Sequence, residues 1–300
     1  MRTTQIAVGP SLPDASGSEP WQLLDREAAS LDQVRQGSPS EEEVTPAVKV
    51  EGLTKTFGRQ GRRVAVFSDL DLSVRKGEFL CLLGPSGCGK STLLSAVAGI
   101  LPFDKGSVKI DGTAVTGPGA DRGMLFQSPM LFSWLTARDN VLFGPRARGL
   151  MRGSRAEIRA QADAMLTTVG LDGFGDAYPH ELSGGMRHRV AFARALLNDP
   201  AVLLMDEPFG ALDALTRSRM HAFLLSLWEA RRTTILFVTH DIEEAILLGD
   251  RVCVFGNRPG GIIEDLDVPL GRPRRFEDVE SPAALVTKRS IRQILWKAAA

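Results

Sequence analysis

Residues 84–92, GPSGCGKST, have the composition and spacing of a phosphate-binding loop. They fit the pattern G-x-x-x-x-G-K-[ST], with Gly84, Gly89, Lys90 and Ser91 at the required positions. Backbone NH groups of such a turn point at a polyphosphate, and the N-terminus of the following helix adds favourable partial charge. We predict that Lys90 reaches the β- and γ-phosphates and that Ser91 places its hydroxyl on Mg2+. The predicted nucleotide contacts of this loop are Gly84, Pro85, Ser86, Gly87, Cys88, Gly89, Lys90, Ser91 and Thr92.

Two acidic residues follow an apolar run, VLLM at residues 202–205. Asp206 stands where other proteins with this loop complete the magnesium shell. Glu207 is next in sequence and is a candidate general base for attack by water. The chemistry indicated is therefore hydrolysis of a nucleoside triphosphate.

A third motif, LSGGMRHRV, occupies residues 182–190. Ser183, Gly184 and Gly185 are predicted to open a helix over residues 186–197, whose N-terminus can bind phosphate. The simpler interpretation is that Ser183 is only a helix N-cap. A phosphate loop occurs in kinases, GTPases and motor proteins alike and does not distinguish between them. The third motif is what distinguishes this chain from those classes.

The three motifs in this order make the chain resemble the ATP-binding cassette (ABC) transporter ATPases over roughly residues 47–268. The resemblance implies that Phe57 stacks on adenine, that Gln127 is the Q-loop residue, that Asp213 lies in the D-loop and that His240 is the switch histidine. Taken alone, a histidine at a strand end is more often an ordinary surface or core residue. Its place in the family's order of motifs supports the functional interpretation.

The same resemblance implies a dimer of two copies that sandwich ATP. The phosphate loop of one copy would face Ser183, Gly184 and Gly185 of the other. The implied catalytic residues are Glu207, His240, Gln127 and Lys90. The implied ligands of Mg2+ are Ser91, Asp206 and Gln127.

The connecting stretches look like those of the nitrate, sulfonate and taurine group of bacterial importers. They are residues 134–140, 178–186, 206–217 and 250–260. The resemblance implies an ATP-hydrolysing subunit that energises uptake of a small anion or organosulfur compound. It would act through a separate membrane permease and, indirectly, an external solute-binding protein, and would lie peripherally on the cytoplasmic face of the inner membrane.

Two further expectations concern His188 and the segment that follows Gln127. His188 replaces the glutamine usual in that group, which predicts a charge on the signature helix that depends on pH near neutrality. The segment from Gln127 to Trp134 is a candidate docking surface for the permease, because it is unusually apolar for a connecting segment and exposed apolar patches commonly mark interfaces. The alternative is that Phe132 and Trp134 pack inside the helical subdomain.

Two other function classes are less well supported. A soluble ABC ATPase acting on DNA or ribosomes would carry long coiled-coil insertions or a second cassette, and the interval between residues 84 and 183 has no sustained heptads. A regulatory nucleotide sensor would be expected to lose the base, yet Glu207 is present.

Composition agrees with a cytosolic protein that acts at the membrane through a partner. The formal net charge is zero, so no nucleic-acid partner is expected. Cys81, Cys88 and Cys253 have no paired metal spacing and suit a reducing compartment. No apolar run approaches the roughly 18 residues needed to cross a bilayer.

The elements that position these residues form an α/β fold: a P-loop NTPase core with a parallel sheet, an antiparallel β subdomain and a helical signature subdomain. Strands over 48–57 and 64–74 are assigned to the antiparallel subdomain. The parallel core takes the strands predicted at 107–110, 123–126, 201–205, 233–238 and 251–255. The helical subdomain spans about 130–198 and includes an amphipathic helix over 156–169.

The two ends of the chain differ from the cassette, which is predicted to span 47–268. Residues 1–46 carry eight acidic residues against three arginines and are expected to be disordered, with an alternative short helix over 19–35. Residues 269–300 form a tail with a terminal helix over 281–298. Its basic amphipathic character suits either a membrane surface or, as we favour, packing against its own domain.

Overall fold

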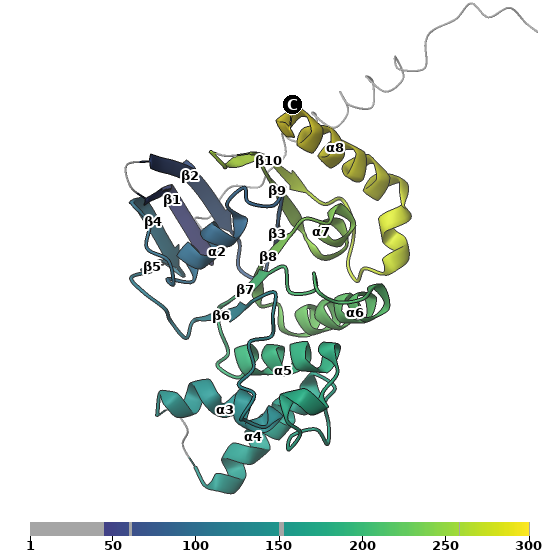
Figure 1. Cartoon of the computed structure of the whole chain (residues 1–300). Helices are drawn as coiled ribbons and strands as arrows, with labels where there is room; N and C mark the ends of the chain where they lie inside the picture. The colour runs from purple at the N-terminus through teal and green to yellow at the C-terminus, as the bar shows by residue number, and fades with distance from the viewer. Residues whose placement is uncertain (1–44, 60–61, 150–152, 258, 300) are drawn as a thin grey trace, which may run out of the picture. The chain divides into compact units, whose positions relative to one another are not determined.

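The structure is a computed structural model that describes residues 45–59, 62–149, 153–257 and 259–299 (Figure 1). The helix predicted over residues 19–35 lies outside the described residues. The described part forms two sheets with helices packed around them, and it is an α/β protein as predicted.

The smaller sheet is antiparallel, with the strand order β2-β1-β4-β5. Its strands are β1 (Val48–Arg59), β2 (Arg62–Val74), β4 (Lys105–Ile110) and β5 (Thr113–Ala114). The assignment of residues 107–110 to the parallel core is therefore wrong, because β4 pairs with β1. Val108 and Ile110 are buried whereas Lys109 is half-buried, and such alternation is typical of a strand with one covered face.

The larger sheet has the strand order β10-β9-β3-β8-β7-β6 and is parallel except for β10. Its strands are β3 (Phe79–Leu83), β6 (Arg122–Leu125), β7 (Val202–Asp206), β8 (Thr234–Thr239), β9 (Arg251–Phe255) and β10 (Ile262–Asp267). Strands β3 and β8 are buried at every position, as expected for central strands covered on both faces. The carboxyl ends of β3, β7 and β8 lie at the same edge of this sheet, where ligands of open α/β sheets bind.

The helices fall into a group around the larger sheet and a separate group in the lower part of Figure 1. The first group comprises α2 (Lys90–Val97), α6 (Ala214–Arg231), α7 (Ile242–Leu248), η2 (Phe276–Glu280) and α8 (Pro282–Ala299). The second comprises α3 (Ala137–Ala147), α4 (Arg155–Thr168), η1 (Pro179–Glu181) and α5 (Gly184–Leu196). Among the described residues, no helix combines the length and apolar character that crossing a bilayer requires.

The pleat of β3 divides the hydrophobic core into two clusters. Phe79, Cys81 and Leu83 belong to the cluster formed with apolar residues of α5, α6 and α7. Leu80 and Leu82 point to the opposite face and join the cluster formed with α2 and the smaller sheet. Because successive side chains of a strand alternate, one buried strand anchors both halves of the molecule around the loop that follows it.

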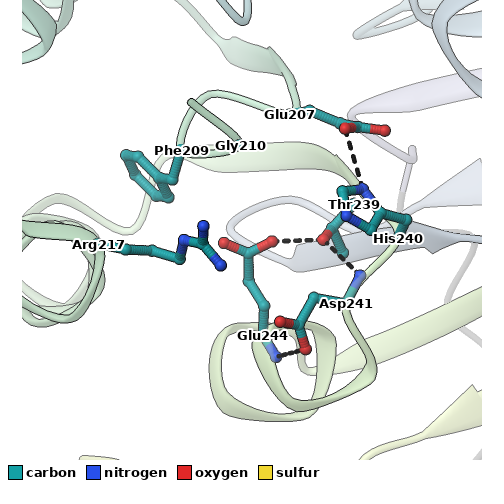
Figure 2. Close-up of a pocket in the computed structure, with 8 residues that line it drawn as sticks. All are labelled: Glu207, Phe209, Gly210, Arg217, Thr239, His240, Asp241 and Glu244. Atoms are coloured by element: carbon teal, nitrogen blue, oxygen red, sulfur yellow. Dashed lines mark hydrogen bonds and ion pairs between the residues drawn. The ribbon is translucent and has the colours of Figure 1, made fainter. Parts of the chain in front are cut away.

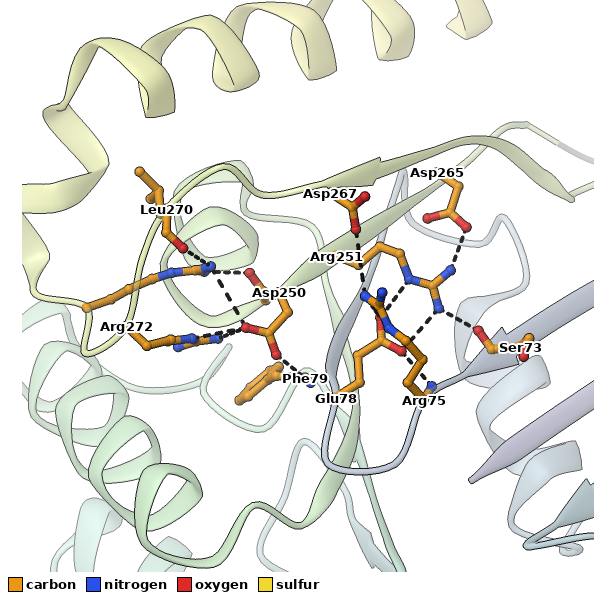
Figure 3. Close-up of polar contacts among 12 residues, drawn as sticks. Ser73, Arg75, Glu78, Phe79, Asp250, Arg251, Asp265, Asp267, Leu270 and Arg272 are labelled. Atoms are coloured by element: carbon orange, nitrogen blue, oxygen red, sulfur yellow. Dashed lines mark hydrogen bonds and ion pairs between the residues drawn. The ribbon is translucent and has the colours of Figure 1, made fainter. Parts of the chain in front are cut away.

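The C-terminal segment packs against its own domain. Helix α8 contacts α7, β9 and η2, and it buries Ala284 and Ile291. The segment before η2 is tied to the larger sheet through Asp250, whose carboxylate accepts hydrogen bonds from the Phe79 backbone NH at 3.0 Å and from Arg272 Nη2 at 2.8 Å (Figure 3). The C-terminal segment therefore contacts α7 directly and is linked to β3 through Asp250.

Candidate functional site

The phosphate loop joins the end of β3 to the start of α2. A Cβ on Gly84 would lie 2.8 Å from the Phe255 carbonyl oxygen, and Gly89 has a φ of +116°, so both positions require glycine. Helix α2 has no side-chain cap and no acidic residue in its first turn. Its first NH groups are therefore available to an anion.

Lys90 lies folded across this loop. Its ammonium donates hydrogen bonds to the carbonyl oxygens of Gly84 at 2.8 Å and Pro85 at 2.9 Å, and the residue is 4% exposed. The amine is held within the turn whose NH groups would bind phosphate. A cation fixed there can neutralise a polyphosphate without a large loss of side-chain freedom.

Ser91 and Asp206 come together from α2 and β7. The Ser91 hydroxyl donates a hydrogen bond of 2.7 Å to Asp206 Oδ1. Burial raises the pKa of the Asp206 carboxyl, the Ser91 hydrogen bond opposes this rise, and the charge of Glu207 adds to it. A nearby cation would relieve that cost, and hydroxyl and carboxylate oxygens are ligands that suit Mg2+. In the described part of the chain no three His, Cys, Asp or Glu side chains gather as a metal cage, so an ion here would also need oxygens from water or phosphate.

Glu207 and His240 meet beyond the ends of β7 and β8. His240 Nδ1 lies 3.0 Å from Glu207 Oε2 (Figure 2). Glu207 has a φ of +43°, a left-handed conformation that is strained for a non-glycine residue and that clusters at functional sites. The Glu207 NH donates to the Val238 carbonyl oxygen at 3.1 Å, which ties this turn to the neighbouring strand.

Gln127 follows β6 and approaches the same edge. A Cβ on Gly210 would lie 3.4 Å from Gln127 Nε2 and 3.7 Å from Glu207 Oε2, so both side chains lie beside this glycine. The structure therefore brings Lys90, Ser91, Asp206, Glu207, His240 and Gln127 to the carboxyl end of the larger sheet. Carboxylate, imidazole and amide groups beside a phosphate loop are equipped to position and activate a water molecule.

Other predicted site residues lie elsewhere in the chain. Phe57 belongs to the smaller sheet, is 47% exposed and has the Lys55 ammonium 5.1 Å from its ring centroid. Ser183 caps α5 by accepting a hydrogen bond of 3.3 Å from the Met186 NH, and Gly184 and Gly185 form the first turn of that helix. Figure 1 shows α5 in the lower helical group, apart from α2, so one chain does not bring the signature to its own phosphate loop.

Asp213 is the N-cap of α6. Its carboxylate accepts a hydrogen bond of 3.0 Å from the Thr216 NH, and hydrogen bonds from Thr216 lower the pKa of the Asp213 carboxyl. The side chain therefore stays ionised and ordered at the start of a long helix, as the helix dipole favours.

The segment after Gln127 is held by a residue that the sequence analysis did not identify. Arg194 on α5 donates hydrogen bonds to the carbonyl oxygens of Pro129 at 2.9 Å and Met130 at 2.7 Å. Leu131 packs against the main core cluster, and the Phe132 ring lies 4.2 Å from that of Phe143. Arg194 shows no distinguishing pattern in the sequence, because its partners lie more than 60 residues away in the chain.

The expectation that His188 titrates near neutrality is wrong. His188 is 4% exposed on the inner face of α5. Burial, assisted by the charge of Arg187, lowers the pKa of the imidazole from 6.5 to about 4. The ring is therefore neutral across the physiological range, because a charged imidazole would lose its hydration there.

A lowered pKa at His188 predicts acid sensitivity of folding rather than of catalysis. The unfolded chain binds a proton below pH 6.5 and the folded chain only near pH 4, so this contribution to stability falls as the pH drops through that window. We expect the parent to lose about 2 kcal/mol more unfolding free energy between pH 7 and pH 5 than the His188→Gln variant does. Urea unfolding of both proteins at the two pH values measures the difference. Equal losses would show that the folded imidazole titrates normally.

Comparisons with known proteins decide the family. The family model described as ABC transporter matches residues 67–210. An uncharacterized ABC transporter ATP-binding protein of Methanocaldococcus jannaschii is 48% identical over 233 residues, which are 78% of this chain and 86% of that protein. The chain belongs to the ABC transporter ATP-binding proteins. This confirms the resemblance identified from the sequence motifs, and the protein is an ATPase coupled to transport.

Other relatives of this ABC ATPase carry more specific names. The nitrate import ATP-binding protein of Synechocystis sp. is 47% identical, with 74% of this chain and 83% of that protein covered. The taurine import ATP-binding protein of Jannaschia sp. is 49% identical, with coverage of 70% and 77%. A solved dimeric ATP-binding cassette in a post-hydrolysis state, bound to ADP and Pi, is 31% identical and matches with a TM-score of 0.65 over 75% of this chain and all of its own.

Proposed function

We propose that this ABC ATPase is the ATP-hydrolysing subunit of an importer for a small oxyanion or organosulfur compound. The observation that carries the hydrolytic part is the pairing of Glu207 with His240 beside the Ser91–Asp206 hydrogen bond and the phosphate loop. Relatives named for import of nitrate, taurine and aliphatic sulfonates support the solute class. The protein would lie on the cytoplasmic face of the cell membrane.

The chemistry divides among the residues at the sheet edge. Lys90 and the loop NH groups bind the phosphates, and Phe57, which comes from the smaller sheet, stacks on adenine. Ser91 and Asp206, with Gln127, would hold Mg2+, which neutralises charge on the phosphates when bound. Glu207 accepts the proton of the attacking water, and His240 orients the Glu207 carboxylate and the γ-phosphate.

Completion of the site requires a second copy of the chain. Ser183, Gly184 and Gly185 at the exposed start of α5 would bind the γ-phosphate held by the partner's phosphate loop, with Asp213 nearby. Two features support this arrangement: α5 lies apart from the phosphate loop of its own chain, and a solved relative is a dimeric cassette. ATP would thereby favour a closed dimer by population shift.

The energy of closure must reach a separate permease, and an external binding protein would deliver the solute to it. The contact we infer is the segment from Gln127 to Trp134. Met130 is 59% exposed and Trp134 is 71% exposed, while Arg194 holds the backbone of this segment against α5. Large exposed apolar side chains on an anchored segment suit a docking surface.

A charged side chain introduced on this surface is expected to uncouple transport from ATP hydrolysis. In cells with the complete transporter, Met130→Glu and Trp134→Glu are expected to abolish uptake of labelled nitrate, taurine or alkanesulfonate, whichever the parent transports. Basal ATPase activity of the purified chain is expected to stay near the parent value. Trp296→Glu is the matched control, because Trp296 is 76% exposed on α8 and outside the proposed surface. Normal uptake by both variants would refute the docking role, and a parent that transports none of these solutes would refute the solute class.

A further inference from the structure

Three buried polar side chains meet behind the end of β8. Glu244, Thr239 and His221 are 8%, 2% and 4% exposed. The Thr239 hydroxyl donates a hydrogen bond to Glu244 Oε2, and His221 Nε2 lies 2.6 Å from Glu244 Oε1. Each oxygen of the buried carboxylate therefore has its own partner. A buried carboxylate is costly to maintain unless it is paired in this way.

This cluster holds both neighbours of His240. Thr239 directly precedes His240, and the Thr239 hydroxyl oxygen also accepts a hydrogen bond of 3.0 Å from the Asp241 NH. Figure 2 shows these contacts beneath the His240 ring, with Glu207 on the other side of the ring. The His240 imidazole itself is 60% exposed, so its position depends on the backbone that carries it.

Helix α7, which carries Glu244, is fixed at both of its ends. At the start, Asp241 Oδ1 accepts hydrogen bonds from the NH groups of Glu243 at 2.8 Å and Glu244 at 3.2 Å. At the end, Arg274 is 5% exposed, and its guanidinium donates to the carbonyl oxygens of Ile246 at 2.9 Å and of Gly249. Because α7 is held at both ends, the Glu244 carboxylate has little freedom to move. Its hydrogen bond to Thr239 therefore holds the end of β8 in place.

The cluster also contacts the segment that carries Glu207. The His221 ring lies 5.4 Å from the Phe209 ring in an edge-to-face arrangement, and Phe209 is two residues after Glu207. The His221 ring also stacks on Phe276 of η2, with centroids 6.0 Å apart. One carboxylate is thus linked to the strand end bearing His240 and, through His221, to the turn bearing Glu207.

We propose that Glu244 is a positioning residue for ATP hydrolysis, which with Thr239 and His221 fixes His240 relative to Glu207. This inference rests on the proposed roles of Glu207 and His240. The hydrogen bonds and ring contacts of the cluster lead to the segments that carry His240 and Glu207, so we expect it to act on the rate of the chemical step and not on nucleotide binding. A displacement of about 1 Å at a reacting group can reduce the rate by about 100-fold.

The test compares carboxylate-to-amide exchanges at adjacent positions in the full-length chain. Glu244→Gln places an NH2 group against either Thr239 or His221, and we expect kcat for MgATP hydrolysis to fall about 10- to 100-fold with KM and MgATP affinity within about twofold of the parent. Glu243→Gln is the control, because the Glu243 side chain is 51% exposed and its ion-pair partner, Lys288, belongs to α8 and not to the cluster. In a His240→Ala background, Glu244→Gln is expected to slow single-turnover hydrolysis no further.

A second pair of variants covers the case in which Glu244→Gln does not fold. Thr239→Val removes the hydroxyl and is expected to lower kcat, whereas Thr239→Ser keeps the hydroxyl and is expected to restore it. A parental kcat in Glu244→Gln or in Thr239→Val would overturn the proposal. An equal slowing by Glu244→Gln with and without His240 would also overturn it. Full activity of a Glu207→Gln variant would instead refute the proposed function, whatever Glu244 does.

Discussion

The Glu207→Gln variant is expected to bind MgATP as the parent does and to hydrolyse it about 10²- to 10⁴-fold more slowly. An amide cannot accept the proton of the attacking water. It can still hydrogen-bond to the His240 ring, whose Nδ1 lies 3.0 Å from the carboxylate in the parent, so the geometry of the pair is retained. Steady-state phosphate release measures the rate, and calorimetric titration measures binding.

The Glu207→Gln protein also reports on the dimer. Because it holds uncleaved ATP, we expect MgATP to convert it from monomer to dimer in sedimentation or light scattering. Glu243→Gln provides the same chemical exchange at an exposed position and is expected to keep the parental rate. Phosphate release by Glu207→Gln within about threefold of the parent would exclude Glu207 as the general base.

The second large effect is complementation between two inactive variants. Lys90→Ala removes the ammonium that lies across the phosphate loop and is expected to weaken binding or hydrolysis within its own chain. Ser183→Arg places a bulky cation at the exposed start of α5 and is expected to leave MgATP binding intact while blocking hydrolysis in the partner. Each variant alone is expected to be almost inactive.

Mixing the two variants is expected to restore activity, because a heterodimer contains one intact loop facing one intact signature. With random pairing and independent sites, the mixture would reach roughly a quarter of the parental rate per site. The measurement is phosphate release as a function of mixing ratio, which should be greatest near equal amounts. A mixture no more active than its components would argue against a site shared across the dimer.

Much of the local structure around the site follows from contiguous residues. The apolar run of β3, the glycine-rich turn after it and the start of α2 at Lys90 form one short stretch, and each step has a local cause in burial, backbone freedom or helix initiation. Helix starts at Ser183 and Asp213 are likewise local, because their side chains cap NH groups three residues ahead. Such signals predict the elements together with the order of the motifs, and hence the family.

Only the tertiary structure shows which site residues far apart in the sequence contact one another. Ser91 and Asp206 are 115 residues apart, and Glu207 and His240 are 33 residues apart. The residue pattern of a strand indicates which side chains share a face, but it does not indicate which neighbouring strand supplies the hydrogen bonds. For this reason β4 was assigned to the wrong sheet.

Burial has the same non-local origin. His188 is neutral because α5 turns it inward, and Glu244 has two partners because β8 and α6 bring Thr239 and His221 to it. The sequence by itself determined the motifs, the strands and helices around them, and the family, since those depend on residues near one another in the chain. The protonation state of His188 and the contacts that position His240 were decided only by the tertiary structure. Desolvation and hydrogen bonding depend on what the fold packs around each group.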